Sequence, residues 1–303
     1  MQIRFFPVHP LLREHVSQIW IVENAAGWRT EDIKTIVPNG RMKIVFPYRS
    51  GLLNRAVSLD GSSRLPGDRA EPFQNNPKDT LWVLGMSDRP SIVDSEGPIG
   101  VLSAELFPGA AFPFFPAELC DFTNRVTPAT DVYGSAGREL QDRLAEEPTA
   151  EGRVRLLEAF LLGLLRQAQR SGELVRHAVR FIQERGGLLT ISELTEKMGY
   201  SQRYLAMVFD RFVGLGPKTL AEIVRFQNRF VALTRYASTT DEAAFDEDYY
   251  DQSHFSREFK RFAGLPPVAY RRKTNEFMTM FYGGATAAPR APDSPGAPSS
   301  SRR

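Results

Sequence analysis

The spacing of hydrophobic and polar positions divides the chain into a strand-rich first part and a helical remainder. Residues 1–130 contain short runs of β-forming residues, separated by Asn-Gly, Pro-Gly and Asp-Gly turn signals. From 131 to 170 the apolar residues recur at helical spacing with a break at Pro148, which predicts two helices. Helical periodicity resumes after Ser171 and Gly172. The predicted strands include Ile19–Val22, Met42–Pro47, Leu81–Leu84 and Ile99–Leu106.

The C-terminal third contains an internal repeat. Tyr200–Pro217 reads YSQRYLAMVFDRFVGLGP and Tyr250–Pro267 reads YDQSHFSREFKRFAGLPP, so eight of the 18 aligned positions are identical. Upstream of each copy stands a T-x-x-E capping box, Thr190–Glu193 and Thr239–Glu242, which is a specific signal for the start of a helix. Each copy therefore predicts a short capped helix, a tight turn that Gly199 supplies in the first copy, and a second helix.

Two helices joined in this way form a helix-turn-helix, whose second helix can enter the major groove of DNA. An apolar stripe predicts the face of each second helix that packs on the first. The stripes consist of Leu205, Phe209 and Phe212 in one copy and Phe255, Phe259 and Phe262 in the other. Apolar positions from Thr219 to Tyr236 predict one continuous connecting helix, about 27 Å long. Since one turn of B-DNA is about 34 Å, both second helices are expected to reach successive major-groove segments.

Composition and charge narrow the class of protein without identifying it. Hydrophobic residues make up 42% of the chain and charged residues 24%, which is typical of a soluble globular protein, and the net charge of +2 lacks the strong basic excess common in nucleic-acid-binding domains. Cys120 is the only cysteine, which excludes an intramolecular disulfide and favours the cytoplasm. The N-terminus lacks the apolar segment of a secretory signal, and the apolar stretch Leu156–Leu165 is shorter than the ~20 residues of a membrane span. No membrane partner is expected.

Residues 173–273 resemble the DNA-binding domain of the AraC/XylS family of transcription regulators. The segment Asp251–Arg272 (DQSHFSREFKRFAGLPPVAYRR) is closely similar to the C-terminal signature of that family. The resemblance covers about a third of the chain and implies a seven-helix domain with two helix-turn-helix units. It also implies an N-terminal regulatory domain, often a cupin-like β-barrel, that senses an effector or mediates dimerisation. Residues 37–46 (VPNGRMKIVF) and 106–119 (LFPGAAFPFFPAEL) resemble sensory domains attached to this family.

We therefore expect an α+β protein with a β-rich sensory domain over 1–130 and helical connector or dimerisation helices over 131–172. An all-α DNA-binding domain over 173–283 is expected to hold helix-turn-helix units at 190–212 and 239–262. The tail 284–303, rich in Pro, Ala, Ser and Gly, is expected to be disordered. The expected function is sequence-specific binding of double-stranded promoter or operator DNA. The resemblance adds RNA polymerase, a small-molecule effector and a second copy of the chain as partners; no cofactor is expected.

The outward faces of the two second helices are the candidates for DNA contact. Arginine can pair bidentately with guanine and glutamine with adenine, each worth ~1–3 kcal/mol of discrimination, and apolar side chains can contact the thymine methyl group. Phosphate contacts position a domain without reading sequence. The expected base-reading residues are Gln202, Arg203, Ala206, Met207, Gln252, Ser253, Ser256 and Arg257. The expected phosphate contacts are Arg211, His254, Lys260, Arg261, Arg271, Arg272 and Lys273. Packing at the helix edge is an alternative for His254, as is a solvated surface role for each arginine.

The second copy departs from the family pattern. Asp248 stands where the family usually has Gly in the turn, a position that costs Asp some strain. Residues 241–248 contain five acidic side chains, and Asp246, Glu247 and Asp248 would repel phosphate if they faced DNA. Weaker docking of the second unit is therefore expected. The alternative function is an interaction module that keeps this fold and acts through protein partners without binding DNA.

Catalytic and metal-binding motifs are missing from the sequence, which contains no H-E-x-x-H, P-loop, G-x-S-x-G or CxxC. His9, His15, His177 and His254 are scattered, so the spacing does not support a metal site of His9, His15 and Cys120. Cys120 lies in an apolar run, which is typical of an inert core residue. A thiol that senses electrophiles, or the nucleophile of a fused enzyme, is the alternative for this residue.

Overall fold

The computed structural model describes residues 1–27, 35–56, 74–95, 97–168, 172–236 and 252–272, with only the backbone described at 55–56, 74, 232–236, 252–255 and 271–272. Among these residues every strand lies before Ala129 and every α-helix after Pro128. The expected α+β class is therefore confirmed. In the described part of the chain, no helix combines the length and the apolar character that crossing a membrane requires.

The strands form two antiparallel sheets. The larger one has the order β1-β2-β9-β4-β7-β10 and consists of β1 (Gln2–Phe6), β2 (Val16–Asn24), β9 (Ile99–Leu106), β4 (Met42–Pro47), β7 (Trp82–Leu84) and β10 (Val126–Pro128). The smaller one has the order β3-β8-β5-β6 and consists of β3 (Thr35–Ile36), β8 (Ser91–Asp94), β5 (Leu52–Ala56) and β6 (Gln74–Asn76). The four predicted runs lie in β2, β4, β7 and β9, and two of them match β4 and β9 residue for residue.

Three helices follow the strands: α1 (Ala129–Tyr133), α2 (Ser135–Glu146) and α3 (Ala150–Gln167). The predicted break at Pro148 separates α2 from α3, and the Thr149 side chain caps α3 by accepting a hydrogen bond from the Gly152 amide. The sequence predicted two helices here. The third, α1, is a short turn that ends at Gly134, whose φ of +59° favours glycine.

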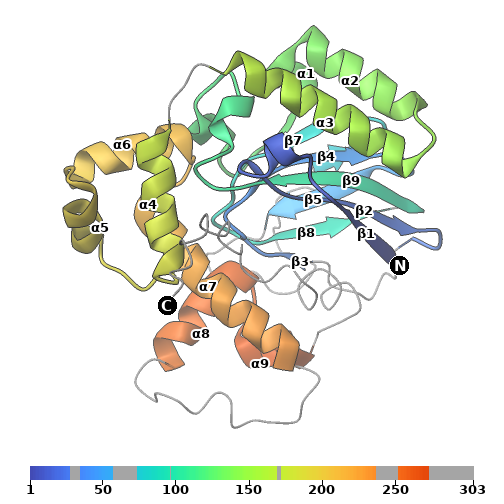
Figure 1. The fold of residues 1–303 in the computed structure, drawn as a ribbon. Helices are drawn as coiled ribbons and strands as arrows, with labels where there is room; N and C mark the ends of the chain where they lie inside the picture. The colour runs from blue at the N-terminus through green and yellow to red at the C-terminus, as the bar shows by residue number, and fades with distance from the viewer. Residues whose placement is uncertain (28–34, 57–73, 96, 169–171, 237–251, 273–303) are drawn as a thin grey trace, which may run out of the picture.

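The two faces of the larger sheet pack against different layers. Side chains alternate along β9, so Leu102 and Ala104 join the core covered by the helices, whereas Ile99 and Val101 join a smaller cluster with Leu52 of β5. In Figure 1, α1–α3 lie over one face of this sheet, and β5 and β8 lie on the other side of it. Because β9 is buried on both faces, its apolar residues do not alternate with exposed polar ones, and its two polar side chains, Ser103 and Glu105, are themselves buried.

The C-terminal part consists of α4 (Glu173–Glu184), α5 (Ile191–Met198), α6 (Gln202–Phe212), α7 (Pro217–Tyr236), α8 (Gln252–Ala263) and α9 (Pro267–Arg272). The predicted connecting helix is confirmed as α7, which begins two residues earlier than Thr219 because the fixed φ of Pro217 suits a first helical turn. The second capping box at Thr239–Glu242, the acidic residues 241–248, Lys273 and the tail 284–303 lie outside the described residues.

The internal repeat is visible in the backbone. A glycine of positive φ follows α6 and α8, +90° at Gly214 and +77° at Gly264. A proline then begins the next helix, Pro217 in α7 and Pro267 in α9. Glycine adopts these φ values without the steric cost that a side chain adds. The two copies therefore share a helix, a glycine turn and a proline-started helix.

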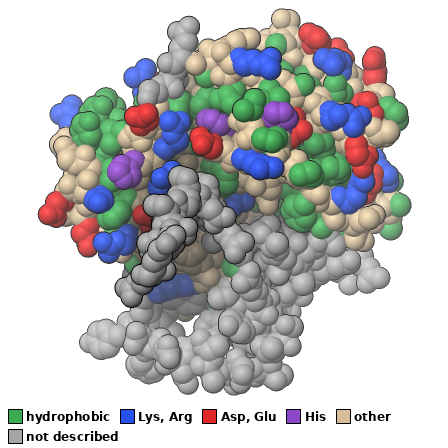
Figure 2. Space-filling view, in the orientation of Figure 1, with side chains coloured by type: hydrophobic (Ala, Val, Ile, Leu, Met, Phe, Trp, Pro, Cys, Tyr) green, Lys and Arg blue, Asp and Glu red, His purple; other side chains and the backbone are tan. Residues whose placement is uncertain are grey.

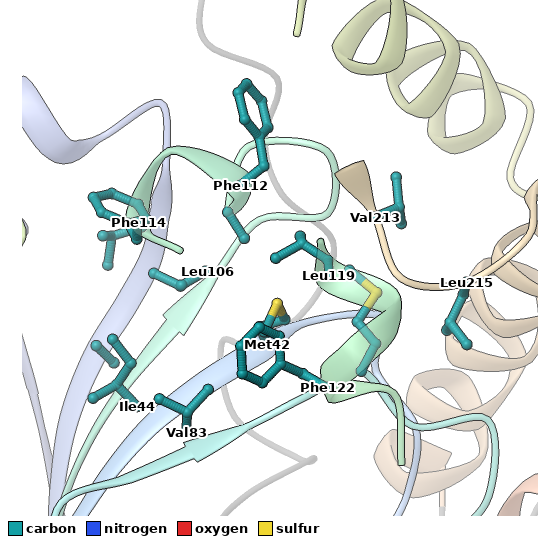
Figure 3. Packing of buried hydrophobic residues seen from close by; sticks show 14 of the residues in the cluster. Met42, Ile44, Val83, Leu106, Phe112, Phe114, Leu119, Phe122, Val213 and Leu215 are labelled. Atoms are coloured by element: carbon teal, nitrogen blue, oxygen red, sulfur yellow. The ribbon is translucent and has the colours of Figure 1, made fainter. Parts of the chain in front are cut away.

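One hydrophobic core runs from the larger sheet into the first copy of the repeat. Figure 3 shows Leu119 and Phe122 between Met42 of β4 and the residues Val213 and Leu215, which follow α6. The short 3₁₀ helix η3 (Leu119–Phe122) places these two side chains inward. The sheet therefore supports the first helix-turn-helix unit through η3.

Candidate nucleic-acid interface

The first helix-turn-helix unit consists of α5, a short turn and α6. Thr190 Oγ1 accepts a hydrogen bond from the Glu193 amide at 3.2 Å, and Glu193 Oε2 accepts one from the Thr190 amide at 2.6 Å. Gly199 adopts a left-handed φ of +72° in the turn, and Ser201 Oγ caps α6 by accepting from the Tyr204 amide at 3.3 Å. The predicted capping box and glycine turn are both confirmed.

The outward face of α6 contains most of the residues expected to read bases in the first unit. Gln202 and Arg203 are exposed, Met207 is 54% exposed and Ala206 is half-buried. The opposite side of the helix, around Leu205, is fully buried. Exposure is a requirement for DNA contact, so these four residues stay candidates.

Two exposed tyrosines extend this face and were not singled out from the sequence. Tyr200 and Tyr204 are 47% and 40% exposed, and their rings stack with centroids 5.0 Å apart. The identity of Tyr200 and Tyr250 in the repeat is the signal that would have found the first of them. The pair adds aromatic surface and two hydroxyl groups beside Arg203.

Arg211, expected to contact phosphate, has a partner within the chain. Its Nε lies 2.9 Å from Glu118 Oε1, and both side chains are about half exposed. Glu118 immediately precedes η3, so this ion pair joins α6 to the N-terminal region. DNA would have to compete with Glu118 for this guanidinium.

The segment around residues 109–123 holds the first unit against the sheet region. Phe112 of η2 (Phe112–Phe114) packs edge-on against Phe212, with ring centroids 5.1 Å apart, and Thr123 Oγ1 donates a hydrogen bond to the Gly214 carbonyl. Phe212 was expected to pack on α5 as part of the stripe. It is half-buried and contacts Phe112 instead, because the N-terminal region covers that side of α6.

Aromatic rings attach the second unit to α7. Phe226 lies 5.6 Å from Phe259 and 5.2 Å from Phe262 of α8, measured between ring centroids. Phe230 lies 5.3 Å from Tyr270 of α9. All five side chains are at most 1% exposed and belong to the same continuous core as the sheet and the first unit, so this core also holds α8 and α9 on α7.

Two ion pairs reinforce this attachment. Arg225 donates from Nε and Nη2 to both oxygens of Glu258, at 3.2 and 2.6 Å, and the Glu258 side chain is only 8% exposed. Such bidentate pairs fix orientation as well as distance. Arg261, expected to contact phosphate, donates to Glu222 Oε2 at 2.8 Å.

The outward face of α8 carries Arg257 and Lys260, which are exposed, and Ser256, which is half-buried. Arg257 and Lys260 are therefore accessible to DNA. The remaining expected contacts in this unit lie outside the described side chains, namely Gln252, Ser253, His254, Arg271, Arg272 and Lys273.

Charge on the visible face of the molecule is mixed. Figure 2 shows Lys and Arg side chains interspersed with Asp and Glu over the described part of this face, rather than one continuous basic surface. This agrees with the net charge of +2. Any DNA contact on this face would depend on individual basic residues rather than on a broad positive field.

Several polar side chains are buried on the face of the larger sheet that packs against the smaller sheet, among them Glu105. Burial alone would raise the pKa of Glu105, but Lys43 and Arg41 outweigh burial and hold that pKa below its usual range. One row further along the sheet, Ser103 Oγ and Trp82 Nε1 are buried and have no hydrogen-bond partner among the described residues. Buried polar atoms are normally paired, so this unpaired group calls for an explanation.

Cys120 and the histidines form no site in the described residues, which contain no group of three or more potential metal ligands. Cys120 was expected in the core, but it is half-buried because η3 turns Leu119 and Phe122 inward instead. Burial, and then the charge of Asp121, raise the pKa of its thiol. His15 is buried, with Nδ1 2.7 Å from the Ala110 carbonyl oxygen.

Comparison with protein families gives two matches. Residues 194–273 match a family described as "Helix-turn-helix domain", and residues 4–128 match one described as "Domain of unknown function (DUF6597)". No curated protein matches the chain significantly.

Solved structures give weaker likenesses. An apo point variant of ToxT from Vibrio cholerae is 10% identical, with a TM-score of 0.45, covering 84% of this chain and 98% of its own. A second crystal form of Vibrio cholerae ToxT is 9% identical, with a TM-score of 0.44, covering 84% and 99%. The AraC-like transcriptional activator CuxR is 12% identical, with a TM-score of 0.24, covering 69% and 79%. TM-scores below 0.5 do not establish a shared fold.

Proposed function

We propose that this protein is a transcription regulator that binds double-stranded DNA sequence-specifically through α6 and α8, since residues 194–273 match a helix-turn-helix family and resemble the DNA-binding domain of the AraC/XylS family. The observation that supports this most is the repeated unit, in which each of these helices leads through a glycine turn into a proline-started helix. The 20 residues of α7 span about 30 Å at 1.5 Å each, close to the ~34 Å of one DNA turn.

The proposal divides the chain as the sequence predicts, with sensing in 1–130, connecting helices in 131–172 and DNA binding in 173–283. In the sensing part, Ser103 Oγ and Trp82 Nε1 offer an unpaired hydroxyl and an unpaired donor inside the sheet layers. A small molecule with a hydrogen-bond acceptor would satisfy Trp82, because an indole nitrogen only donates. Effector binding there would alter how α6 and α8 are presented to DNA.

The test of DNA binding is selection of bound sequences from a random duplex pool by the full chain. The expected result is a motif with two parts whose centres are about one helical turn, 10–10.5 base pairs, apart. Affinity for the selected site should fall steeply with salt, because bound cationic side chains release counterions from DNA. A chain that enriches no sequence would contradict the proposal.

Roles within the interface are separated by two arginine variants. Arg257→Ala is expected to relax base preference at one position of the selected site, a loss of ~1–3 kcal/mol of discrimination. Arg272→Ala is expected to weaken binding to selected and random duplexes alike. Equal effects of both variants on both duplexes would contradict the assigned roles.

The second candidate function is a protein-interaction module that does not bind DNA. It is favoured by the pairing of two expected phosphate-binding residues with carboxylates, Arg211 with Glu118 and Arg261 with Glu222. The salt titration distinguishes the two functions. A chain that binds no duplex with a steep salt dependence would favour the interaction module.

A further inference from the structure

We propose that residues 38–41, in the loop between β3 and β4, couple the buried carboxylate of Glu105 to helix α7. The position and charge of this carboxylate then control DNA affinity. The inference rests on the proposed function for its DNA readout. It concerns how the sheet region regulates the helix-turn-helix units, and it assigns that role to named contacts.

The first link is the set of bonds that Glu105 makes inside the sheet. Its Oε2 accepts hydrogen bonds from Asn39 Nδ2 at 3.2 Å and from Arg41 Nη1 at 3.0 Å. Its Oε1 accepts one from Trp20 Nε1 at 3.4 Å and lies 3.8 Å from Lys43 Nζ. The Glu105 side chain is only 6% exposed. A buried carboxylate is strongly unfavourable without such partners, so its position and charge constrain Asn39 and Arg41.

The second link is the conformation of the loop itself. Asn39 uses both ends of its side chain, because Oδ1 accepts from the Arg41 amide at 3.2 Å while Nδ2 donates to Glu105. Gly40 between them has a φ of +66°, which glycine adopts without strain. The loop is thus a tight turn whose shape depends on the bond to Glu105.

The third link joins the loop to α7. Gln227 Nε2 donates a hydrogen bond to the Pro38 carbonyl. A Cβ at Gly40 would lie 3.2 Å from Leu220 Cδ1 and 3.7 Å from Ile223 Cγ2, which shows how closely the loop backbone approaches the buried side of α7. A movement of the loop by about one ångström would break this contact or push α7.

The fourth link joins α7 to α8 of the second unit. On α7, Glu222 and Arg225 pair with Arg261 and Glu258 of α8. These residues lie on the same stretch of α7 as Leu220, Ile223 and Gln227. A shift of α7 imposed by the loop is therefore transmitted to α8.

The experiment uses the full chain as wild type, as the single variants Glu105→Gln, Asn39→Ala and Gln227→Ala, as the double variant of Asn39→Ala with Gln227→Ala, and as the control Arg49→Met. Glu105→Gln keeps the shape of the side chain and removes its charge. Asn39→Ala removes the hydrogen bond between the loop and Glu105 without changing a residue of α7. The control removes another ion pair of the sheet region, Arg49 with Glu23 of β2 at 2.7 Å. Circular dichroism and the melting temperature identify the variants that fold.

The first readout is hydrogen exchange of α7 amides without DNA, and the second is the Kd for the selected duplex. Asn39→Ala and Glu105→Gln should speed exchange over residues 217–231 and change Kd about fivefold or more, whereas Arg49→Met changes neither. Combining Asn39→Ala with Gln227→Ala should add little to either single change, because both cut one connection.

Folded variants whose α7 exchange and Kd equal those of wild type would overturn the coupling, as would strictly additive effects of Asn39→Ala and Gln227→Ala. If wild type selects no DNA while α7 exchange still responds to Asn39→Ala, the proposed function fails and the loop–helix contact stands. The two failures are therefore distinguishable.

Discussion

Individual ion pairs determine how freely basic side chains of the helix-turn-helix units can meet DNA. Arg211 and Glu118 are 49% and 47% exposed. Exposed pairs contribute roughly 0–1 kcal/mol, because water screens them and both side chains lose freedom. A DNA phosphate can therefore replace Glu118. Arg225 differs, since its partner Glu258 is nearly buried, so that pair supports structure rather than binding.

Cys120 is expected to react slowly with alkylating reagents. Burial and the neighbouring carboxylates of Asp121 and Glu118 raise its thiol pKa, so less thiolate is present at pH 7 than in an unfolded chain. The rate of reaction with iodoacetamide at pH 7 should therefore be lower for the native chain than for the urea-unfolded chain. The native rate should rise as the pH is made alkaline. A native rate above the unfolded rate at pH 7 would contradict this, and would support a reactive thiol.

Thr190→Ala is expected to lower the free energy of unfolding by about 1 kcal/mol, because it removes the cap on the Glu193 amide. Urea unfolding measures this change.

The reciprocal contact, from Thr190 to the Glu193 carboxylate, depends on pH. Hydrogen bonds from the backbone and side chain of Thr190 lower the pKa of Glu193, so its contribution is present above the unfolded pKa and is lost as pH falls through the lowered folded value. The stability difference between wild type and Glu193→Gln should therefore shrink from about pH 5 to pH 3. Urea unfolding at several pH values measures this, and a difference that grows on acidification would contradict it.

At the scale of elements, α7 is the helix to which the other parts attach. It packs against α4. Its Asn228 Nδ2 donates to the Gly186 carbonyl in the turn after α4, at 3.4 Å, and its Arg225 pairs with Glu258 of α8. Its Gln227 donates to the loop carbonyl of Pro38. A helix packed on three sides cannot shift without changing at least one of these contacts. In the proposed coupling, α7 is the element through which the loop 38–41 acts on the second unit.

The two glycine turns of the first unit should respond differently to the same substitution. Gly199→Ala is expected to cost about 1–2 kcal/mol, from the left-handed φ alone, because no other atom lies within 4 Å of the added Cβ. Gly214→Ala should cost more, because its Cβ would also lie 2.8 Å from the Leu119 carbonyl oxygen. Urea unfolding of both variants measures the difference. Equal costs would show that η3 yields to the added methyl group.

At the scale of the whole molecule, the sheet region and the first unit share one hydrophobic core. They are therefore expected to unfold together, in a single calorimetric transition. Two well-separated transitions for these parts of the wild-type chain would contradict a shared core.

Leu119→Ala tests the same core at its centre. Leu119 is 1% exposed and lies between β4 and the turn after α6, so the substitution should cost about 2–5 kcal/mol and destabilise both parts together. Leu52→Ala, in the smaller cluster, is the matched control. It should lower the melting temperature of the shared transition, but under native conditions it should increase proteolytic cleavage near residues 213–216 less than Leu119→Ala does. Equal cleavage there in both variants would contradict the assigned position of Leu119.

Local signals were sufficient to predict β4, β9, α7 and the first helix-turn-helix unit. A strand or helix period, the Thr190 capping box and the proline at 217 act within a few residues of where they stand, so their effect can be read along the chain. The family resemblance then supplied the expected function, which periodicity and charge alone do not contain.

The contacts between distant parts of the chain could not be read in that way. Glu118 and Arg211 pair across 93 positions (211 − 118), and Glu105 meets Asn39 across 66. The sequence around one partner does not predict the other, because the two residues are brought together by the packing of the sheet on the helices. Tertiary packing alone therefore determined how the basic residues are paired and which loop contacts α7. It also determined that one core joins the sheet to the first unit.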